Sequence, residues 1–193
     1  GSEMCIRDRP EALQKRLQKV HTGAQRSAHL VHQLLSLART ETDITRSPLD
    51  VAALAREVAR EWTPRAVAAG VDLGYEGEDS LTIPGDKLLL REVLSNLIDN
   101  ALRYAGKGVN VTLRTEVRDG FCILEVEDNG PGLSTEHLER VFERFWRASE
   151  LPGGCGLGLS IVAEIAMRHR GTATARTTLP HGLTISLQLP LQG

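Results

Sequence analysis

The apolar positions between Pro10 and about Thr42 recur at steps of three and four residues, which predicts one long amphipathic helix. Its apolar side chains form a narrow seam, made of Leu13, Leu17, Val20, Ala24, Ala28, Val31, Leu35 and Ala38. Because so narrow a seam cannot build a core alone, we expect it to pack either in a coiled-coil-like stem or on its own globular domain. Residues 1–9 do not continue the pattern, and we expect them to be a remnant of cloning or a disordered leader.

Helical and strand-like periods alternate after Ser47 to Asp50, which interrupts the first helix and places Asp50 as the N-cap of a second. Further helices are predicted over Val51–Ala69, Lys87–Tyr104, Thr135–Phe145 and Leu157–Arg170. Strands are predicted over Val71–Tyr75, Leu81–Ile83, Val109–Val117, Phe121–Glu127, Thr172–Thr178 and Leu183–Leu189, with a turn at Asp119-Gly120. Adjacent strand pairs mixed with helices predict an α+β fold, a two-layer α/β sandwich over residues 45–193, preceded by the long helix over residues 10–44.

Composition narrows the class of protein without naming it. Hydrophobic residues make up 41% and charged residues 25%, which is sufficient for a packed core. The formal net charge of -2 offers no electrostatic basis for non-specific nucleic-acid binding, and no run of about 18 apolar residues predicts a membrane span. Cys5, Cys122 and Cys155 lack metal-ligand spacing, and their odd number argues against a disulfide framework. A reducing cytoplasm fits this composition best.

The predicted helix over Lys87–Tyr104 carries a row of polar side chains spaced by four, four and three residues, so that they share one face. The row consists of Glu92, Asn96, Asn100 and Arg103. The opposite face is apolar and consists of Leu90, Val93, Leu94, Leu97, Ile98 and Ala101. Amide oxygens are hard neutral ligands that suit Mg²⁺, and a cation one turn further on suits phosphate oxygens. The alternative is a solvated helix face with ordinary polar residues.

Two glycine-containing turns follow, each at the end of a predicted element. Asp128 to Gly132 ends an apolar strand, where glycines let a ligand approach the backbone and a buried carboxylate can accept from an adenine amino group. Gly154 to Leu159 opens a helix, where exposed backbone N–H groups form an anion site. Taken singly, the first motif is compatible with a simple turn, and the second lacks the Gly-Lys-Ser/Thr ending of a P-loop.

Taken in order, the motifs closely resemble the histidine kinase branch of the GHKL ATP-binding superfamily, which also includes heat-shock chaperones, topoisomerase subunits and mismatch-repair ATPases. The family's boxes are matched by Ser95 to Ala101 (N box), Asp128 to Gly132 (first glycine box), Val141 to Phe145 (F box) and Gly154 to Leu159 (second glycine box). Four boxes in order, over about Leu49 to Leu191, make the match specific. The resemblance implies the family's Bergerat-type ATP-binding fold.

The resemblance also implies roles for the polar row, with ATP and Mg²⁺ as ligands. Asn96 and Asn100 would hold Mg²⁺ and phosphate oxygens. Arg103 and Tyr104 would line the phosphate side of the site. Glu92 matches the acid that helps to activate the attacking group in this family.

The remaining boxes would hold the base and cover the phosphates. The resemblance implies that Asp128 accepts from the adenine amino group, while Gly130 and Gly132 leave room for the ring. Arg144 would face the γ-phosphate. The residues implied to hinge a lid over the triphosphate are Gly154, Gly156 and Gly158, followed by Leu159. The lid candidate, Arg147 to Gly154, is short for this family.

Pro10 to Thr42 resembles the second helix of the family's dimerisation and phosphoacceptor stem, especially over His32 to Arg39. No histidine of the chain is followed by Glu or Asp, as the acceptor motif requires. We therefore expect this chain to lack the acceptor and its histidines to be polar residues of surfaces or interfaces. They are His21, His29, His32, His137, His169 and His181.

The resemblance implies an ATP-dependent protein-histidine kinase of two-component signalling, with ATP, the phosphoacceptor stem helix and a response regulator as partners. It also implies a homodimer in the intact protein and a cytoplasmic position in an inner-membrane sensor, without membrane or nucleic-acid contact by this part. One alternative is a nucleotide-responsive interaction module without transfer activity. Another is a serine-phosphorylating relative such as an anti-sigma factor kinase, although such kinases do not need a stem-like helix.

Overall fold

The structure is a computed structural model that describes residues 45–148 and 155–192. These residues belong to the second of the two compact units into which the chain divides, Thr40–Gly193. The helix predicted over Pro10–Thr42, the leader over residues 1–9 and Gly154 lie outside the described residues. Within the described ranges, no helix combines the length and the apolar character that crossing a membrane requires.

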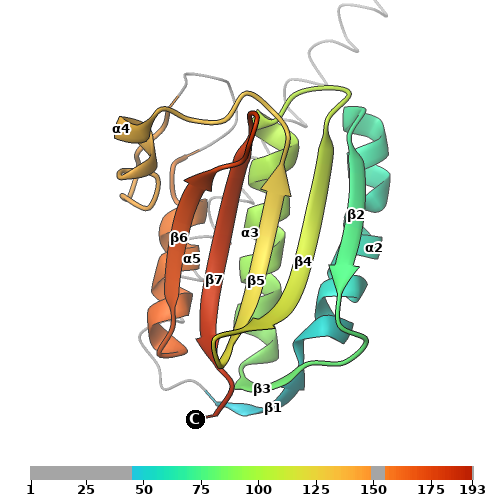
Figure 1. Cartoon of the computed structure of the whole chain (residues 1–193), viewed down its shortest axis with the longest axis vertical. Helices are drawn as coiled ribbons and strands as arrows, with labels where there is room; N and C mark the ends of the chain where they lie inside the picture. The colour runs from blue at the N-terminus through green and yellow to red at the C-terminus, as the bar shows by residue number, and fades with distance from the viewer. Residues whose placement is uncertain (1–44, 149–154, 193) are drawn as a thin grey trace, which may run out of the picture. The chain divides into compact units, whose positions relative to one another are not determined.

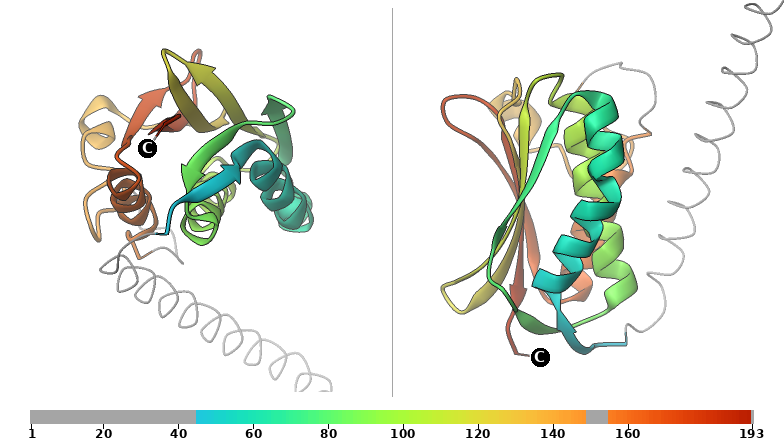
Figure 2. Two further views of the ribbon diagram at one scale, coloured as in Figure 1. Left: turned by 90° about the horizontal axis from the view of Figure 1, so that it is seen from below. Right: turned by 90° about the vertical axis from the view of Figure 1, so that its right-hand side faces the viewer.

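A five-stranded sheet forms one layer, and helices α2, α3 and α5 cover one of its faces (Figures 1 and 2). The strand order is β2-β4-β5-β7-β6, with β2 parallel to β4 and the other neighbours antiparallel. The elements are β1 Ser47–Asp50, α2 Val51–Ala69, β2 Asp72–Gly77, β3 Thr82–Gly85, α3 Lys87–Tyr104, β4 Asn110–Arg118, β5 Phe121–Asp128, α4 Thr135–Leu138, α5 Gly158–Arg168, β6 Thr172–Thr177 and β7 Leu183–Pro190. The predicted two-layer α/β sandwich is confirmed.

Local side-chain caps set where the two long helices begin. The carboxylate of Asp50 accepts a hydrogen bond from the Ala53 N–H at 3.0 Å, as expected of the N-cap of α2. Asp86 caps α3 in the same way and accepts from the Leu88 N–H at 2.9 Å. At its other end α2 stops at Gly70, whose φ of +72° lies in the left-handed region that glycine tolerates.

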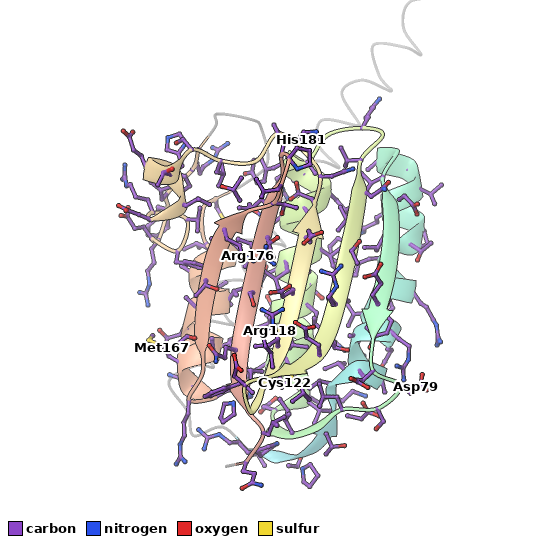
Figure 3. All side chains as sticks on the ribbon, viewed as in Figure 1. Asp79, Arg118, Cys122, Met167, Arg176 and His181 are labelled. Atoms are coloured by element: carbon purple, nitrogen blue, oxygen red, sulfur yellow. The ribbon has the colours of Figure 1, made fainter. Side chains whose placement is uncertain are left out.

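The core lies between the sheet and the helices, whereas the other face of the sheet is charged. The largest fully buried side chains include Leu90, Leu94, Leu97 and Ile98 of α3 and Leu113, Leu124 and Leu187 of the sheet. Cys122 lies in this core as a thiol, and burial raises its pKa to about 12. On the uncovered face, Glu125 is 1% exposed and lies within 4 Å of Arg114, Arg118 and Arg176. Figure 3 labels Arg118 and Arg176 on this face.

Helices α3 and α5 pack side by side in opposite directions (Figures 1 and 2). The link lies at the start of α3, where the Asp86 N–H donates to Nε2 of His169 at 3.1 Å. His169 is the C-cap residue of α5, and its Nδ1 donates to the Ile165 carbonyl at 2.8 Å. Arg46 joins the same corner by donating to the Arg168 carbonyl at 2.6 Å. The end of α3 and the start of α5 therefore both lie at the opposite end of the helix layer.

His169 corrects one expectation from the sequence. It is 3% exposed, so it is not a surface residue. Its two ring nitrogens bond as donor and acceptor, which requires the neutral imidazole. Burial lowers the pKa of His169 below its ordinary value, and the nearby positive charge of Arg46 acts in the same direction.

Two elements differ from the sequence predictions. Ser47–Asp50 is predicted only as a break before the second helix, and it also forms a strand because it finds an antiparallel partner in β3, with Leu49 opposite Ile83. The helix predicted over Thr135–Phe145 ends at Leu138. Phe145 has a φ of +64°, which no α-helix contains, and its N–H bonds to a residue far along the chain.

Candidate functional site

The polar row of α3 is organised by a hydrogen bond between its first two members. Asn96 is only 6% exposed, and its amide nitrogen donates to the Glu92 carboxylate at 3.1 Å. This bond assigns the orientation of the amide. The amide oxygen of Asn96 has no hydrogen bond among the described residues, so it remains able to bind a cation or an external donor. Asn100 lies one turn further on and is half-buried.

The last turn of α3 carries an ion pair that the sequence pattern did not predict. Arg103 donates to the Asp99 carboxylate at 2.6 Å, four residues earlier on the same helix. Both side chains are half-buried, as is Tyr104. The Arg103 guanidinium at the end of the polar row is thus held by Asp99, a carboxylate that the sequence interpretation left out.

Asp128 is the last residue of β5, and its carboxylate is buried at 7% exposure. One carboxylate oxygen accepts from the Gly130 N–H at 2.9 Å. Burial raises the pKa of Asp128, while hydrogen bonds from the Gly130 and Leu183 N–H groups act in the opposite direction. No cation is paired with Asp128 among the described residues, so this acceptor suits an uncharged N–H donor from outside the chain.

The glycines after Asp128 are required by close approaches of the backbone. A Cβ at Gly130 would lie 2.6 Å from the carbonyl oxygen of Ala105, the C-cap residue of α3. Gly132 has a φ of +71°, and a Cβ there would lie 2.6 Å from the Gly182 carbonyl oxygen. The loop from Asp128 to Gly132 therefore sits against both the end of α3 and the turn between β6 and β7.

The F box and the second glycine box are joined directly. The Phe145 N–H donates to the Gly156 carbonyl at 2.8 Å, and a Cβ at Gly156 would lie 2.6 Å from the Phe145 carbonyl carbon. Gly158 and Leu159 are the first two residues of α5. Arg144 is exposed and makes no hydrogen bond or ion pair with any residue in the described ranges.

The structure thus brings most of the predicted site to one end of the helix layer (Figure 1). Gly130 touches the end of α3, which carries the asparagines, and α5 starts at the same end with Gly158. His181, which we expected to be an ordinary surface residue, bonds to the first glycine loop through Nδ1 and the Gly130 carbonyl, 3.0 Å apart. Only the strand register that places Leu183 opposite Asp128 reveals this contact.

Comparison with known proteins identifies the arrangement. Residues 85–193 match the family model described as "Histidine kinase-, DNA gyrase B-, and HSP90-like ATPase". The probable sensor histidine kinase TcrY of Mycobacterium tuberculosis is 34% identical over an alignment of 197 positions, which covers 97% of this chain and 40% of that protein. The chain spans about two-fifths of the length of the curated relatives it matches.

Solved structures agree with this match. Histidine kinase AdeS of Acinetobacter baumannii superposes with a TM-score of 0.72 at 25% identity, covering 96% of each chain. Full-length ShkA, solved in complex with AMPPNP, gives a TM-score of 0.74 at 29% identity, covering 84% of this chain and 35% of that one. The chain therefore belongs to the histidine kinase-, DNA gyrase B- and HSP90-like ATPase family, as a catalytic ATP-binding domain of the two-component histidine kinase type.

Proposed function

We propose that this domain binds Mg-ATP and that the intact protein transfers the γ-phosphoryl group to a histidine of its stem. The observation that carries the proposal is that the loop of the buried Asp128 contacts the C-terminal end of α3, and that the second half of this helix carries Asn96 and Asn100. An acceptor for a base and a row of ligands for phosphates thus lie at the same end of the helix layer. Family membership supports the same reading.

Base recognition would rest on Asp128. Adenine presents an amino group where guanine presents a carbonyl oxygen, so a buried acceptor selects the amino group. Gly130 holds one oxygen of the carboxylate, which fixes the direction in which the other can accept. The burial of Asp128 and its raised pKa are compatible with this role, because a carboxylate without a cation partner is stabilised by a hydrogen bond from a neutral donor.

The residues present fit magnesium and phosphate. The described residues contain no group of three or more His, Cys, Asp and Glu side chains that could hold a metal, so the protein ligands would be the amide oxygens of Asn96 and Asn100. Mg²⁺ accepts few protein ligands and completes its shell with phosphate oxygens and water. Bound Mg²⁺ would neutralise charge on the phosphates. The start of α5, whose N-cap Leu157 makes no side-chain cap bond, would contribute backbone N–H groups.

Phosphoryl transfer needs mainly alignment and charge neutralisation from the protein. Glu92 would orient the Asn96 amide through their hydrogen bond, besides helping to activate the attacking histidine. Arg144 has an exposed guanidinium that would face the γ-phosphate, and Arg103 would line the phosphate side from its pair with Asp99. The roles that the resemblance implies are retained in this proposal for Tyr104, Gly132, Gly154, Gly156 and Leu159.

The wider assignment follows from the same proposal. The helix predicted over residues 10–44 would be the second helix of a stem that carries the acceptor histidine on its other helix. A homodimer, a response regulator as the next phosphate acceptor, and a place in the cytoplasmic portion of an inner-membrane sensor would complete the system. The structure of ShkA with AMPPNP supports the nucleotide as ligand, as a property of that relative.

Titration calorimetry with Mg-ADP tests the binding part of this proposal. Asp128→Asn replaces the acceptor oxygen by a possible donor, and loss of a buried hydrogen bond to a charged group corresponds to a drop in affinity of about tenfold or more. Asp119→Asn in the exposed turn between β4 and β5 is the matched control, because asparagine tolerates its φ of +53°. Unchanged affinity of Asp128→Asn would remove the adenine assignment.

Transfer needs a separate experiment. The chain is mixed with a separately prepared acceptor stem and ATP labelled in the γ-phosphate. Label on the stem histidine supports the kinase, whereas tight binding without label would favour the nucleotide-responsive module, and label on serine would favour the serine-kinase relative.

A further inference from the structure

The turn between β6 and β7 is packed against the first glycine loop without space for side chains between them. A Cβ at Gly182 would lie 2.0 Å from the Asp128 carbonyl oxygen, and one at Gly132 would lie 2.6 Å from the Gly182 carbonyl oxygen. Both contacts are backbone to backbone, so neither segment can shift without moving the other. The turn is therefore part of the wall that holds the loop.

One side chain of this turn reaches the loop as well. Nδ1 of His181 lies 3.0 Å from the carbonyl oxygen of Gly130. A carbonyl oxygen only accepts, so Nδ1 must carry the proton and donate. Figure 3 shows His181 at the end of the sheet where the chain turns into β7.

Gly130 is consequently held from both sides. Its N–H donates to the Asp128 carboxylate at 2.9 Å, and its carbonyl accepts from His181 at 3.0 Å. The direction of the Asp128 side chain depends on the Gly130 N–H, together with the Leu183 N–H that also acts on it. Packing against the Ala105 backbone limits the position of Gly130 on one side, and the bond to His181 fixes the orientation of its peptide group on the other.

We propose that His181 is a positioning residue for base recognition: it fixes Gly130 and, through Gly130, the direction of the Asp128 carboxylate. This inference rests on the proposed function of Asp128. His181 touches neither phosphate nor metal in this scheme, so its effect falls on the base alone. The contribution of one hydrogen bond at a partly exposed site corresponds to a change of about three- to tenfold in affinity.

The geometry of the side chain supplies a rescue variant. The amide nitrogen of asparagine stands two bonds from Cβ, as Nδ1 of histidine does, so His181→Asn can donate to the same carbonyl. His181→Ala removes the donor. Leu179→Ala is the matched control, because Leu179 belongs to the same turn and is 89% exposed.

The experiment measures dissociation constants of the full chain for Mg-ADP and Mg-GDP, by calorimetry and by competition. His181→Ala should bind Mg-ADP about three- to tenfold more weakly and Mg-GDP unchanged, so that base discrimination falls by the same factor. His181→Asn and Leu179→Ala should stay within about twofold of the wild type. A cooperative unfolding transition of each variant, followed by circular dichroism, checks that the domain remains folded.

The outcomes separate the two proposals. If the wild-type chain does not bind Mg-ADP, the proposed function fails. If it binds, three results would overturn the role of His181 while leaving that function standing. These are equal affinity of His181→Ala and wild type, an equal loss for both nucleotides, and an asparagine variant as weak as the alanine variant.

Discussion

Alanine substitutions at four glycines separate two costs that the structure predicts, crowding and a positive φ. At Gly130 a Cβ would lie 2.6 Å from a backbone oxygen, although its φ is outside the positive range. At Gly120 φ is +80°, and no atom lies within 4 Å of the Cβ. Gly156 combines a φ of +71° with a contact of 2.6 Å. Gly74 has neither, because no atom lies within 4 Å and its φ is not positive.

The distances set the expected order of stability loss. An ordinary contact starts at 3.4 Å, so a methyl group at Gly130 requires a shift of 3.4 − 2.6 = 0.8 Å. Overpacking of this kind costs about 1–3 kcal/mol. A non-glycine residue in the left-handed region costs about 1–2 kcal/mol, which is the loss expected at Gly120. Gly156→Ala should approach the sum, about 2–5 kcal/mol, and Gly74→Ala should lie within about 0.5 kcal/mol of the wild type.

The affinity for Mg-ADP should further distinguish the glycine-to-alanine variants. The Cβ at Gly130 would also lie 2.9 Å from the Asp128 carboxylate oxygen, so the shift disturbs the group proposed to bind adenine. Gly130→Ala should therefore weaken Mg-ADP binding, whereas Gly120→Ala and Gly74→Ala should not. Urea unfolding followed by circular dichroism gives the free energies, and calorimetry gives the affinities.

The reasoning is refuted if Gly130→Ala matches Gly74→Ala in both stability and affinity. Such a result would mean that the loop does not approach the end of α3 as described. Equal destabilisation at Gly120 and Gly156 would refute the separation of the two costs, because only the second position is crowded.

Two further predictions concern buried titratable groups away from the site, His169 and Glu125. Because burial lowers the pKa of His169, the unfolded chain takes up a proton below its ordinary value of 6.5 before the native chain does, so stability should fall as pH decreases below about 6.5. The urea midpoint of His169→Gln should show a smaller decrease between pH 8 and pH 5.5, and an unchanged decrease would contradict this. Glu125→Ala should cost about 2 kcal/mol, less than for a fully buried pair because its arginine partners are partly exposed. The loss should shrink when unfolding is repeated at high salt, and a salt-independent loss would argue against an electrostatic origin.

Local signals were sufficient for much of the fold. The bounds predicted for the helices over Val51–Ala69 and Lys87–Tyr104 coincide with α2 and α3. Both begin at an aspartate that caps its own first turn and continue through a regular apolar face, so each signal lies within the helix. The turn at Asp119-Gly120 is likewise local, because both residues adopt positive φ.

Contacts between distant segments explain what the sequence pattern did not reveal. The helix predicted up to Phe145 ends at Leu138 and is followed by turns, in which Arg140 and Glu143 each donate three residues back, before Phe145 bonds to Gly156. The burial of His169 depends on the start of α3 lying beside the end of α5. In the candidate site, too, local motifs and distant contacts contribute differently. The order of the motifs along the chain indicated the four boxes, whereas the bond from His181 to Gly130 arises only when β5 and β7 pair.

The corner formed by Arg46, Asp86 and His169 has a consequence for how the domain can be controlled. Arg46, which lies just before β1, donates to the end of α5, and α3 starts beside that end at Asp86. Helix α3 has 18 residues and, at 1.5 Å per residue, is about 27 Å long. Because both helices are buried against the sheet along their length, a displacement at Arg46 would reach the first glycine loop only through this packed layer.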